Sequence, residues 1–124
     1  VAFTGSVISE VLPLSPMPAE AIELKTEHAS GGGGADLITG GAGNDFLSGD
    51  DGNDSLYGGL GDDTVDAGTG NDSVTGGVGN DSVAGGDGND TLGGGDGNDT
   101  VAGGTGDDSV DGGDGNDTVA GDAG

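Results

Sequence analysis

A nine-residue unit repeats ten times in succession between residues 31 and 120. Aligned on Gly31, the units read GGxGxDxUx, where U is a large aliphatic residue and x varies. The fourth position is Gly and the sixth is Asp in all ten units, whereas Ala67 interrupts the first column of glycines and Asp50 the second. A fixed short period without insertions is typical of solenoids, in which identical units stack. It therefore constrains the fold more than any other feature of the chain.

The eighth position of the unit supplies the apolar residues of the repeat. They are Ile38, Leu47, Leu56, Val65, Val74, Val83, Leu92, Val101, Val110 and Val119. Within a unit, GGxGxD is typical of a turn, because Gly allows positive φ angles and Asn or Asp tolerates the left-handed region. The last three residues, x-U-x, predict a short strand whose middle side chain faces one side. Two units then form an 18-residue coil, and ten units form about five coils. We expect an all-β parallel solenoid whose whole core is these ten residues between two parallel sheets.

Composition changes abruptly at the start of the repeat. All three Pro, all four Glu, the only Lys and the only His precede it. This predicts a non-repeat segment over residues 1–30 and a repeat domain over residues 31–124, in which residues 121–124 are a truncated eleventh unit. Residues 1–14 are interpreted as a linker or the last strand of a preceding domain. For residues 19–30 two structures stay open: a helix of two or three turns, and a capping strand, AIELKT, that covers the end of the stack.

The repeat is strongly acidic. After residue 30 the chain has 20 Asp and no basic residue, and the formal charge of the whole chain is −23. Such a surface repels nucleic acids and anionic lipid headgroups and concentrates cations. There is no Cys to form disulfides and no apolar run long enough to cross a membrane. The single His28 has neither Cys nor a second His nearby, so it is interpreted as a solvated surface residue and not as a metal ligand.

Stacking is expected to align the Asp residues of the sixth position. One column would contain Asp36, Asp54, Asp72, Asp90 and Asp108, and the other Asp45, Asp63, Asp81, Asp99 and Asp117. Between successive turns, two carboxylates would meet backbone carbonyl oxygens exposed by the glycines. An all-oxygen site of this kind suits Ca²⁺, whereas Zn²⁺ prefers Cys or His and Mg²⁺ keeps its waters. Ten buried aliphatic residues cannot offset the entropy of ordering so long a Gly-rich repeat, so the metal-free repeat is expected to be largely unfolded.

The expected carbonyl ligands lie at the second and fourth positions of the units. They belong to Gly32, Gly34, Gly41, Gly43, Gly52, Gly59, Gly61, Gly68, Gly70, Gly77, Gly79, Gly86, Gly88, Gly95, Gly97, Gly104, Gly106, Gly113 and Gly115. Five turns in each column leave four gaps, so the repeat would hold about eight Ca²⁺ at most. Eight ions would reduce the formal charge from −23 to about −7 and remove most of the repulsion between carboxylates.

Units such as GGAGNDFLS (40–48), GGVGNDSVA (76–84) and GGDGNDTVA (112–120) resemble the RTX (repeats-in-toxin) nonapeptide of calcium-binding proteins. The resemblance covers 90 of the 124 residues. It implies a right-handed parallel β-roll in which position-six Asp side chains and turn carbonyls hold Ca²⁺. It also implies export of the unfolded chain from the bacterial cytosol by a type I secretion system and folding outside the cell. Asp50 departs from the pattern, because a non-Gly residue there needs an unfavourable turn that could alter its site.

Three functions follow from this reading. The first is a calcium-dependent folding module that stabilises neighbouring domains of a larger secreted bacterial protein, including the non-catalytic part of an enzyme or toxin. The second is an ice-binding or adhesive β-roll surface, suggested by a column of Thr and Ser at position seven. The third, an enzyme within these residues, is not expected, because one His and no Cys provide no nucleophile–base pair. An EF-hand is excluded because no Glu follows Glu27.

Overall fold

The computed structural model describes residues 21–23 and 27–123, and every regular element in this part of the chain is a β-strand. The strands are β1 (Ala21–Glu23), β2 (Glu27–Ser30), β3 (Leu37–Ala42), β4 (Asp45–Ser48), β5 (Ser55–Leu60), β6 (Thr64–Thr69), β7 (Ser73–Val78), β8 (Ser82–Asp87), β9 (Thr91–Asp96), β10 (Thr100–Thr105), β11 (Ser109–Asp114) and β12 (Thr118–Ala120). Within these residues there is no apolar helix of the length that a membrane requires.

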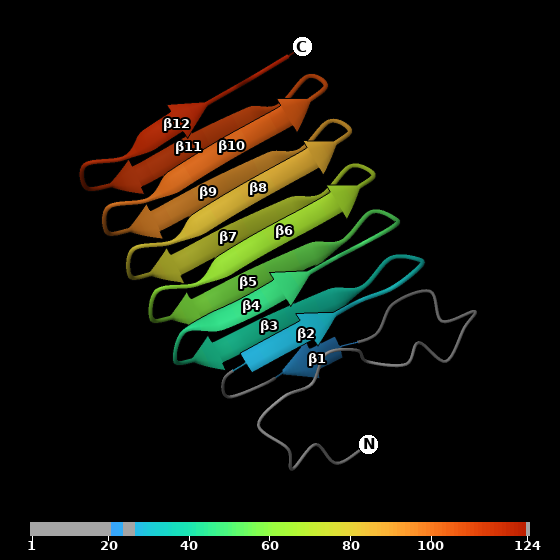
Figure 1. Ribbon diagram of the computed structural model, residues 1–124, viewed down its shortest axis with the longest axis horizontal. Coiled ribbons are helices and arrows are strands. Elements are labelled where there is room, and N and C mark those ends of the chain that lie inside the picture. The colour runs from blue at the N-terminus through green and yellow to red at the C-terminus, as the bar shows by residue number, and fades with distance from the viewer. Residues whose placement is uncertain (1–20, 24–26, 124) are drawn as a thin grey trace.

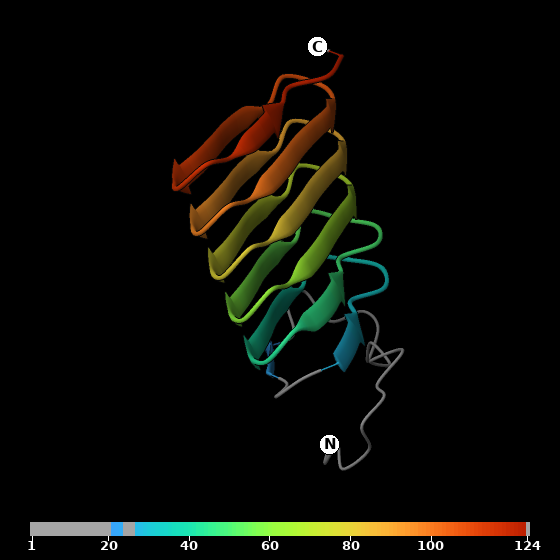
Figure 2. The same ribbon diagram turned by 60° about the vertical axis from the view of Figure 1, so that its left-hand side comes forward.

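The strands form two six-stranded parallel sheets (Figure 1). One sheet has the order β1-β3-β5-β7-β9-β11 and the other the order β12-β10-β8-β6-β4-β2. Within the repeat, paired residues are 18 positions apart, as in Leu56↔Val74 and Val65↔Val83. Figure 2 shows the chain passing from one sheet to the other at every turn. The predicted parallel β-roll, with two nonapeptides in each coil, is therefore confirmed.

The N-terminal end of the stack extends beyond the repeat. The ten units supply β3 to β12, while β1 pairs with β3 and β2 pairs with β4, both in parallel. The helix considered for residues 19–30 is wrong over residues 21–23 and 27–30, because the open edges of β3 and β4 offer backbone partners that an isolated helix lacks. The capping strand is found over the first three residues of AIELKT. Residues 24–26 and the linker expected over residues 1–14 lie outside the described residues.

The strands of the repeat are longer than the three residues expected from x-U-x. Most contain six residues and run from position seven of one unit to position three of the next, as β7 does from Ser73 to Val78. The first two glycines of a unit have no side chains, so the backbones of neighbouring coils pair through them, as in Gly59↔Gly77. The predicted six-residue turn is therefore too long, because only positions four to six connect the sheets.

The core lies between the sheets and follows the eighth position of the repeat. Eight of the ten predicted core residues, Ile38 to Val101, are buried, and Ala29 and Ala67 join them. Val110 is half-buried against this cluster, and the side chain of Val119 is 48% exposed. The prediction is wrong for Val119, because no described strand packs over the last coil.

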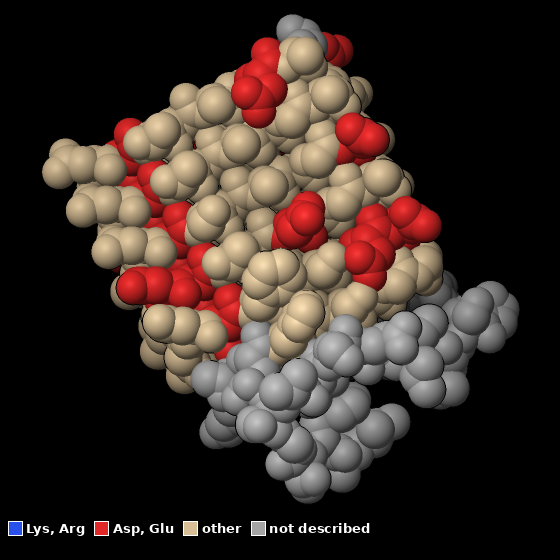
Figure 3. Space-filling view, in the orientation of Figure 1, with Lys and Arg blue, Asp and Glu red and all other residues tan. Residues whose placement is uncertain are grey.

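The outer faces of the sheets are mostly Ser, Thr and Asp, with a few exposed apolar residues near the N-terminal end. His28 is half-buried, and its ring meets that of Phe46 edge-on with a centroid distance of 4.6 Å. The histidine predicted to be a solvated surface residue is thus only partly exposed, because β2 and β4 pair and bring the two rings together. In Figure 3 a row of acidic side chains follows the left-hand edge, where Figure 1 shows the turns that leave the odd-numbered strands.

Candidate metal centre

The Asp residues of the sixth position stand at the end of each turn, next to the strand that follows. Asp54, for example, immediately precedes β5, and Asp72 immediately precedes β7. Those of the first eight units, from Asp36 to Asp99, are buried, with at most 5% of each residue exposed. Asp108 and Asp117, in the last coil, are half-buried. Placing so many carboxylates in the interior is costly unless hydrogen bonds or cations compensate for the lost water.

In the eight column Asp residues from Asp54 to Asp117, one carboxylate oxygen continues the stack through a hydrogen bond. The backbone N–H of Asp54 donates to Oδ1 of Asp72 at 2.7 Å, and that of Asp63 donates to Oδ1 of Asp81 at 2.8 Å. The same bond, between 2.7 and 2.9 Å long, joins Asp36 to Asp54, Asp45 to Asp63, Asp72 to Asp90, Asp81 to Asp99, Asp90 to Asp108 and Asp99 to Asp117. The structure thus brings the ten Asp residues together in the two columns expected from the sequence.

The second carboxylate oxygen has no such bond in much of the stack. Buried Oδ2 atoms without a hydrogen-bond partner are found in Asp54, Asp63, Asp72, Asp81, Asp90, Asp99 and Asp108. Each ionised oxygen that is removed from water without a hydrogen-bond partner destabilises the fold by ~1–3 kcal/mol or more. These seven oxygens, arranged along two columns, fit a bound cation, because a cation between turns would supply the missing interaction.

A backbone carbonyl oxygen lies near most of these Oδ2 atoms. A Cβ built on Gly58 would lie 2.5 Å from Oδ2 of Asp63 in the same unit and 2.5 Å from the carbonyl oxygen of Gly76 in the next coil. A Cβ built on Gly40 would lie 2.7 Å from Oδ2 of Asp45 and 2.6 Å from the carbonyl oxygen of Gly58. Carboxylate and carbonyl oxygens therefore converge beside the first glycine of most units, which is the donor chemistry that Ca²⁺ prefers.

The expected carbonyl ligands of positions two and four have similar surroundings along the stack. At position two, the carbonyl oxygens of Gly32 and Gly104 accept backbone hydrogen bonds from Asp51 and Ala123 at 2.9 and 3.0 Å. At both positions most carbonyl oxygens lie against the glycine of the next coil, where an added Cβ would overlap them, as at Gly77 for position two and Gly79 for position four. The ligand roles of both sets stay predictions, as do those of the Asp side chains.

No three side chains of His, Cys, Asp or Glu lie close enough to hold a metal ion by themselves within residues 21–23 and 27–123. Each gap in a column contributes two carboxylates at most. A cation in the turns would consequently depend on backbone oxygens for most of its coordination, which favours an ion that accepts many neutral oxygen ligands.

Burial raises the pKa of the column carboxyls. Loss of water, together with repulsion by the neighbouring Asp of the column, raises the pKa of Asp54 to about 7 and that of Asp63 to about 6, although a backbone hydrogen bond opposes each change. The pKa values of Asp72, Asp81 and Asp90 are raised for the same reasons, with desolvation as the largest cause.

These pKa values predict that acid stabilises the metal-free roll. A carboxyl whose pKa is higher in the folded state contributes stability that is fully present below its unfolded pKa, near 3.8, and is lost as the pH rises through 6 to 7. We expect the chain in calcium-depleted buffer to gain β-structure in far-UV circular dichroism when the pH is lowered from 8 to 5. The calcium-saturated chain at pH 8 provides the reference spectrum. A metal-free chain with equal or less β-structure at pH 5 would contradict the burial of the carboxyls.

Asp50, the single non-Gly residue at position two of the ten full units, is accommodated in a specific way. Its φ of 72° lies in the left-handed region, as the sequence predicts. Its carboxylate accepts hydrogen bonds from the hydroxyl of Ser30, from Ser48 Oγ at 2.7 Å and from the N–H of Gly32 at 3.2 Å. Burial would raise the pKa of Asp50, but these bonds and the nearby His28 hold it below its ordinary value. The carboxylate therefore links β2 and β4 at the N-terminal end of the roll.

Position five carries a second ladder that the sequence reasoning did not identify. The side-chain oxygen of Asn53 accepts the backbone N–H of Asn71 at 2.8 Å, and that of Asn71 accepts the N–H of Asn89 at 2.9 Å. The ladder also joins Asn44 to Asp62, Asp62 to Asn80, Asn80 to Asn98, Asn89 to Asp107 and Asn98 to Asn116. The signal was present, since nine of the ten units carry Asn or Asp at this position.

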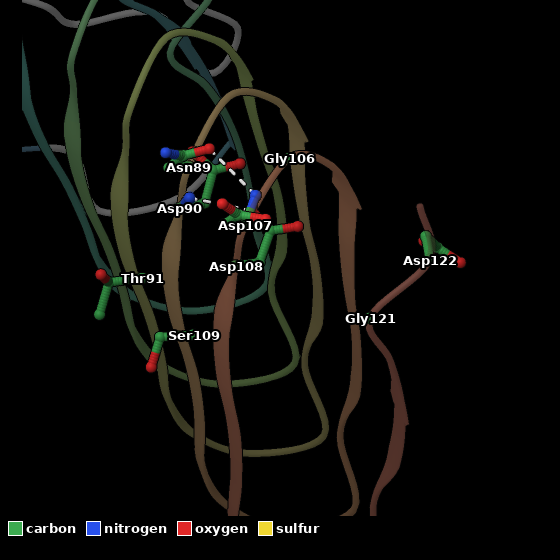
Figure 4. Close-up of a pocket in the computed structure, with 9 residues that line it drawn as sticks. All are labelled: Asn89, Asp90, Thr91, Gly106, Asp107, Asp108, Ser109, Gly121 and Asp122. Atoms are coloured by element: carbon green, nitrogen blue, oxygen red, sulfur yellow. Dashed lines mark hydrogen bonds between the residues drawn. The ribbon is translucent and has the colours of Figure 1, made fainter. Parts of the chain in front are cut away.

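A surface hollow marks the last turns of one column (Figure 4). Its lining residues are Asn89, Asp90, Thr91, Gly106, Asp107, Asp108, Ser109, Gly121 and Asp122. The two dashed hydrogen bonds in Figure 4 are those of the position-five and position-six ladders, from Asp107 to Asn89 and from Asp90 to Asp108. The hollow is therefore the end of the Asp column and not a separate site.

Two parallel sheets joined by turns with buried, aligned carboxylates define a repeat module of the β-roll class. The family model for the RTX calcium-binding nonapeptide repeat (4 copies) matches residues 30–65, 57–92 and 93–124. Because these matches cover most of the chain, the chain belongs to this family, whose repeats bind calcium and whose β-roll is structural and not catalytic. Comparison with curated proteins and with solved structures finds no significant match.

Proposed function

We propose that this chain is a calcium-dependent folding module of a secreted bacterial protein, largely unfolded without Ca²⁺ and folded when Ca²⁺ binds outside the cell. The observation that carries the proposal is the set of seven buried Oδ2 atoms without a hydrogen-bond partner. They lie in turns that also present backbone carbonyl oxygens, and the raised pKa values of Asp54 and Asp63 indicate how strongly the metal-free fold disfavours their charge.

Within the sites, the residues of the chain have distinct tasks. The Oδ1 atoms and backbone N–H groups of the Asp columns fix the carboxylates in place, and seven Oδ2 atoms are left buried without a hydrogen-bond partner. The turn carbonyls complete an all-oxygen environment. Ca²⁺ supplies positive charge between the carboxylates, and up to about eight ions would reduce the formal charge from −23 to about −7.

The same physics supports a role outside the cell. A Gly-rich chain with a formal charge of −23 and a small core stays extended where free calcium is scarce, which suits export through a type I secretion channel. Extracellular calcium would then fold the repeat, and the folded roll would stabilise a neighbouring domain of a larger chain. The boundary between this domain and the segment of residues 1–30 is part of the proposal, and the family match beginning at residue 30 supports it.

A calcium titration followed by far-UV circular dichroism tests the function. We expect a coil spectrum without calcium that converts cooperatively to β-structure near ~10⁻⁴ to 10⁻³ M Ca²⁺, the range of extracellular calcium modules. Mg²⁺ over the same range serves as the control and should leave the spectrum unchanged. A chain that is already β-structured at neutral pH without calcium, or one that calcium leaves as a coil, would refute the proposal.

Replacing Asp81 with Asn should remove charge from two neighbouring gaps while keeping a side-chain oxygen to accept the N–H of Asp63. We expect fewer Ca²⁺ ions per chain, by up to two, and a higher calcium concentration for folding, measured by equilibrium dialysis and circular dichroism. Asp96→Asn is the matched control, because Asp96 carries the same charge on the exposed outer face. Equal calcium binding by both variants would argue against ligation by the column.

A further inference from the structure

The first position of the unit is where a Cβ and the Asp carboxylate compete for space. A Cβ on Gly49 would lie 2.5 Å from Oδ2 of Asp54 and 2.5 Å from the carbonyl oxygen of Ala67, and a Cβ on Gly76 would lie 2.5 Å from Oδ2 of Asp81. Real Cβ atoms essentially never approach another heavy atom within 3.0 Å. The unpartnered oxygen therefore keeps its position beside the strand because the residue at position one is glycine.

Ala67 is the one residue of this column in the ten units that carries a Cβ. It lies in β6, it is fully buried, and it packs in the hydrophobic cluster between the sheets. It does not have a positive φ, so its methyl group takes the direction that the added Cβ has at the equivalent glycines. The methyl group cannot turn away to solvent, because the core surrounds it.

The carboxylate opposite this methyl group belongs to Asp72. Its Oδ1 accepts the N–H of Asp54 at 2.7 Å, and its own N–H donates to Asp90 at 2.8 Å, as in every other coil. Oδ1 and the backbone are consequently held in the ladder, so Oδ2 is the group that has to move. This oxygen is buried without a hydrogen-bond partner, and position one of its unit is Ala67, where the equivalent units have a glycine.

We propose that the methyl group of Ala67 displaces Oδ2 of Asp72 and makes this turn the weakest cation site of its column. The inference rests on the proposed function. The weak site at Asp72 divides the column into an N-terminal pair of turns, at Asp36 and Asp54, and a C-terminal pair, at Asp90 and Asp108. The other column has glycine at position one in all five units and is uninterrupted. The two columns therefore fill differently, and the last calcium to bind is the one beside Ala67.

The variant Ala67→Gly, made in the full chain, tests the inference. Calcium binding is counted by equilibrium dialysis at a concentration that leaves the parent chain short of saturation, and folding is followed by circular dichroism. We expect at least one more ion bound per chain and a lower calcium midpoint for folding. If the substitution changed only the stability of the fold, the calcium midpoint for folding would rise instead. Glycine adds freedom to the unfolded chain and leaves a gap in the core, and both changes destabilise the folded state.

Two further Gly→Ala variants complete the experiment. Gly85→Ala places a methyl group beside Asp90 in the next coil of the same column and should lose at least one bound ion. Gly93→Ala is the control, since the nearest atom to its Cβ would be the carbonyl oxygen of Val74 at 3.9 Å. If Ala67→Gly binds no more calcium than a calcium-binding parent, the inference is overturned while the proposed function stands. A parent that binds no calcium overturns both.

Discussion

We expect Val83→Asp to abolish calcium-dependent folding or to raise the calcium that folding requires far above that of the parent. Val83 is the second residue of β8 with 2% of its surface exposed, and its register partners Val65 and Val101 are buried as well. An unpaired carboxylate at this place destabilises the folded state by about 3–5 kcal/mol. The core consists of single aliphatic residues from successive coils, so no other layer can compensate. Circular dichroism at 10 mM Ca²⁺ measures the remaining β-structure.

Val119→Asp is the informative control for this prediction. Val119 occupies the same position of the repeat and pairs in register with Val101, but its side chain is 48% exposed at the end of the stack. The new carboxylate stays in contact with water there, so we expect a small shift in the calcium midpoint and a β-roll at 10 mM Ca²⁺. From the repeat pattern alone, the two variants should be equally damaging. If they are, the burial of the core described above is wrong.

The contrast between Val83 and Val119 shows what the period of the repeat specifies. Two nonapeptides in each coil place residues 18 positions apart beside each other, and this predicts the Asp columns and the buried residues of the central coils. A period carries no information about what lies beyond its first and last coil. The exposure of Val119 and the half-burial of Asp117 depend on neighbours that the repeat itself does not provide.

Strand length was a second limit of the sequence reasoning. The pattern GGxGxD predicts a six-residue turn, because glycine allows positive φ angles and Asn or Asp tolerates the left-handed region. In the stack the first two glycines extend the sheets, because the absence of side chains lets the backbones of adjacent coils approach, as at Gly59 and Gly77. The additional strand length comes from pairing between coils, so the strand propensity of a single unit does not predict it.

The repeat pattern also does not predict contacts that depend on side-chain orientation. The bonds from Ser30 and Ser48 to Asp50 require knowledge that β2 continues the sheet beyond the repeat. With that knowledge the pair is recognisable, because Ser30 and Ser48 are 18 residues apart and both precede the first glycine of a unit. The convergence of Asp Oδ2 with a position-one carbonyl oxygen was likewise not predicted, since the sequence reasoning considered only carbonyls of positions two and four.

The fourth position of the unit is Gly in all ten units, and the structure leaves no room there for a side chain. Gly79 has a φ of 136°, and a Cβ there would overlap the carbonyl oxygen of Gly61 in the preceding coil. The glycines of position two also have positive φ angles and the same overlap, but Asp50 occupies this position by adopting a φ of 72°, within the left-handed region that Asp tolerates. A φ of 136° lies well outside that region, and backbone atoms, which cannot rotate away as a side chain does, fill the space.

Gly79→Ala should therefore prevent neighbouring coils from stacking. Backbone strain and steric overlap together should destabilise the folded state by about 3 kcal/mol or more. The calcium titration measured by circular dichroism should show no transition, or one displaced far above that of the parent. Gly93→Ala makes the same chemical change at a site with an ordinary φ and no atom nearer than 3.9 Å, so its transition should match that of the parent within a small shift. Parent-like folding of Gly79→Ala would mean that neighbouring turns are not in contact. Calcium between those turns would then have to be coordinated by something other than closely stacked carbonyls and carboxylates.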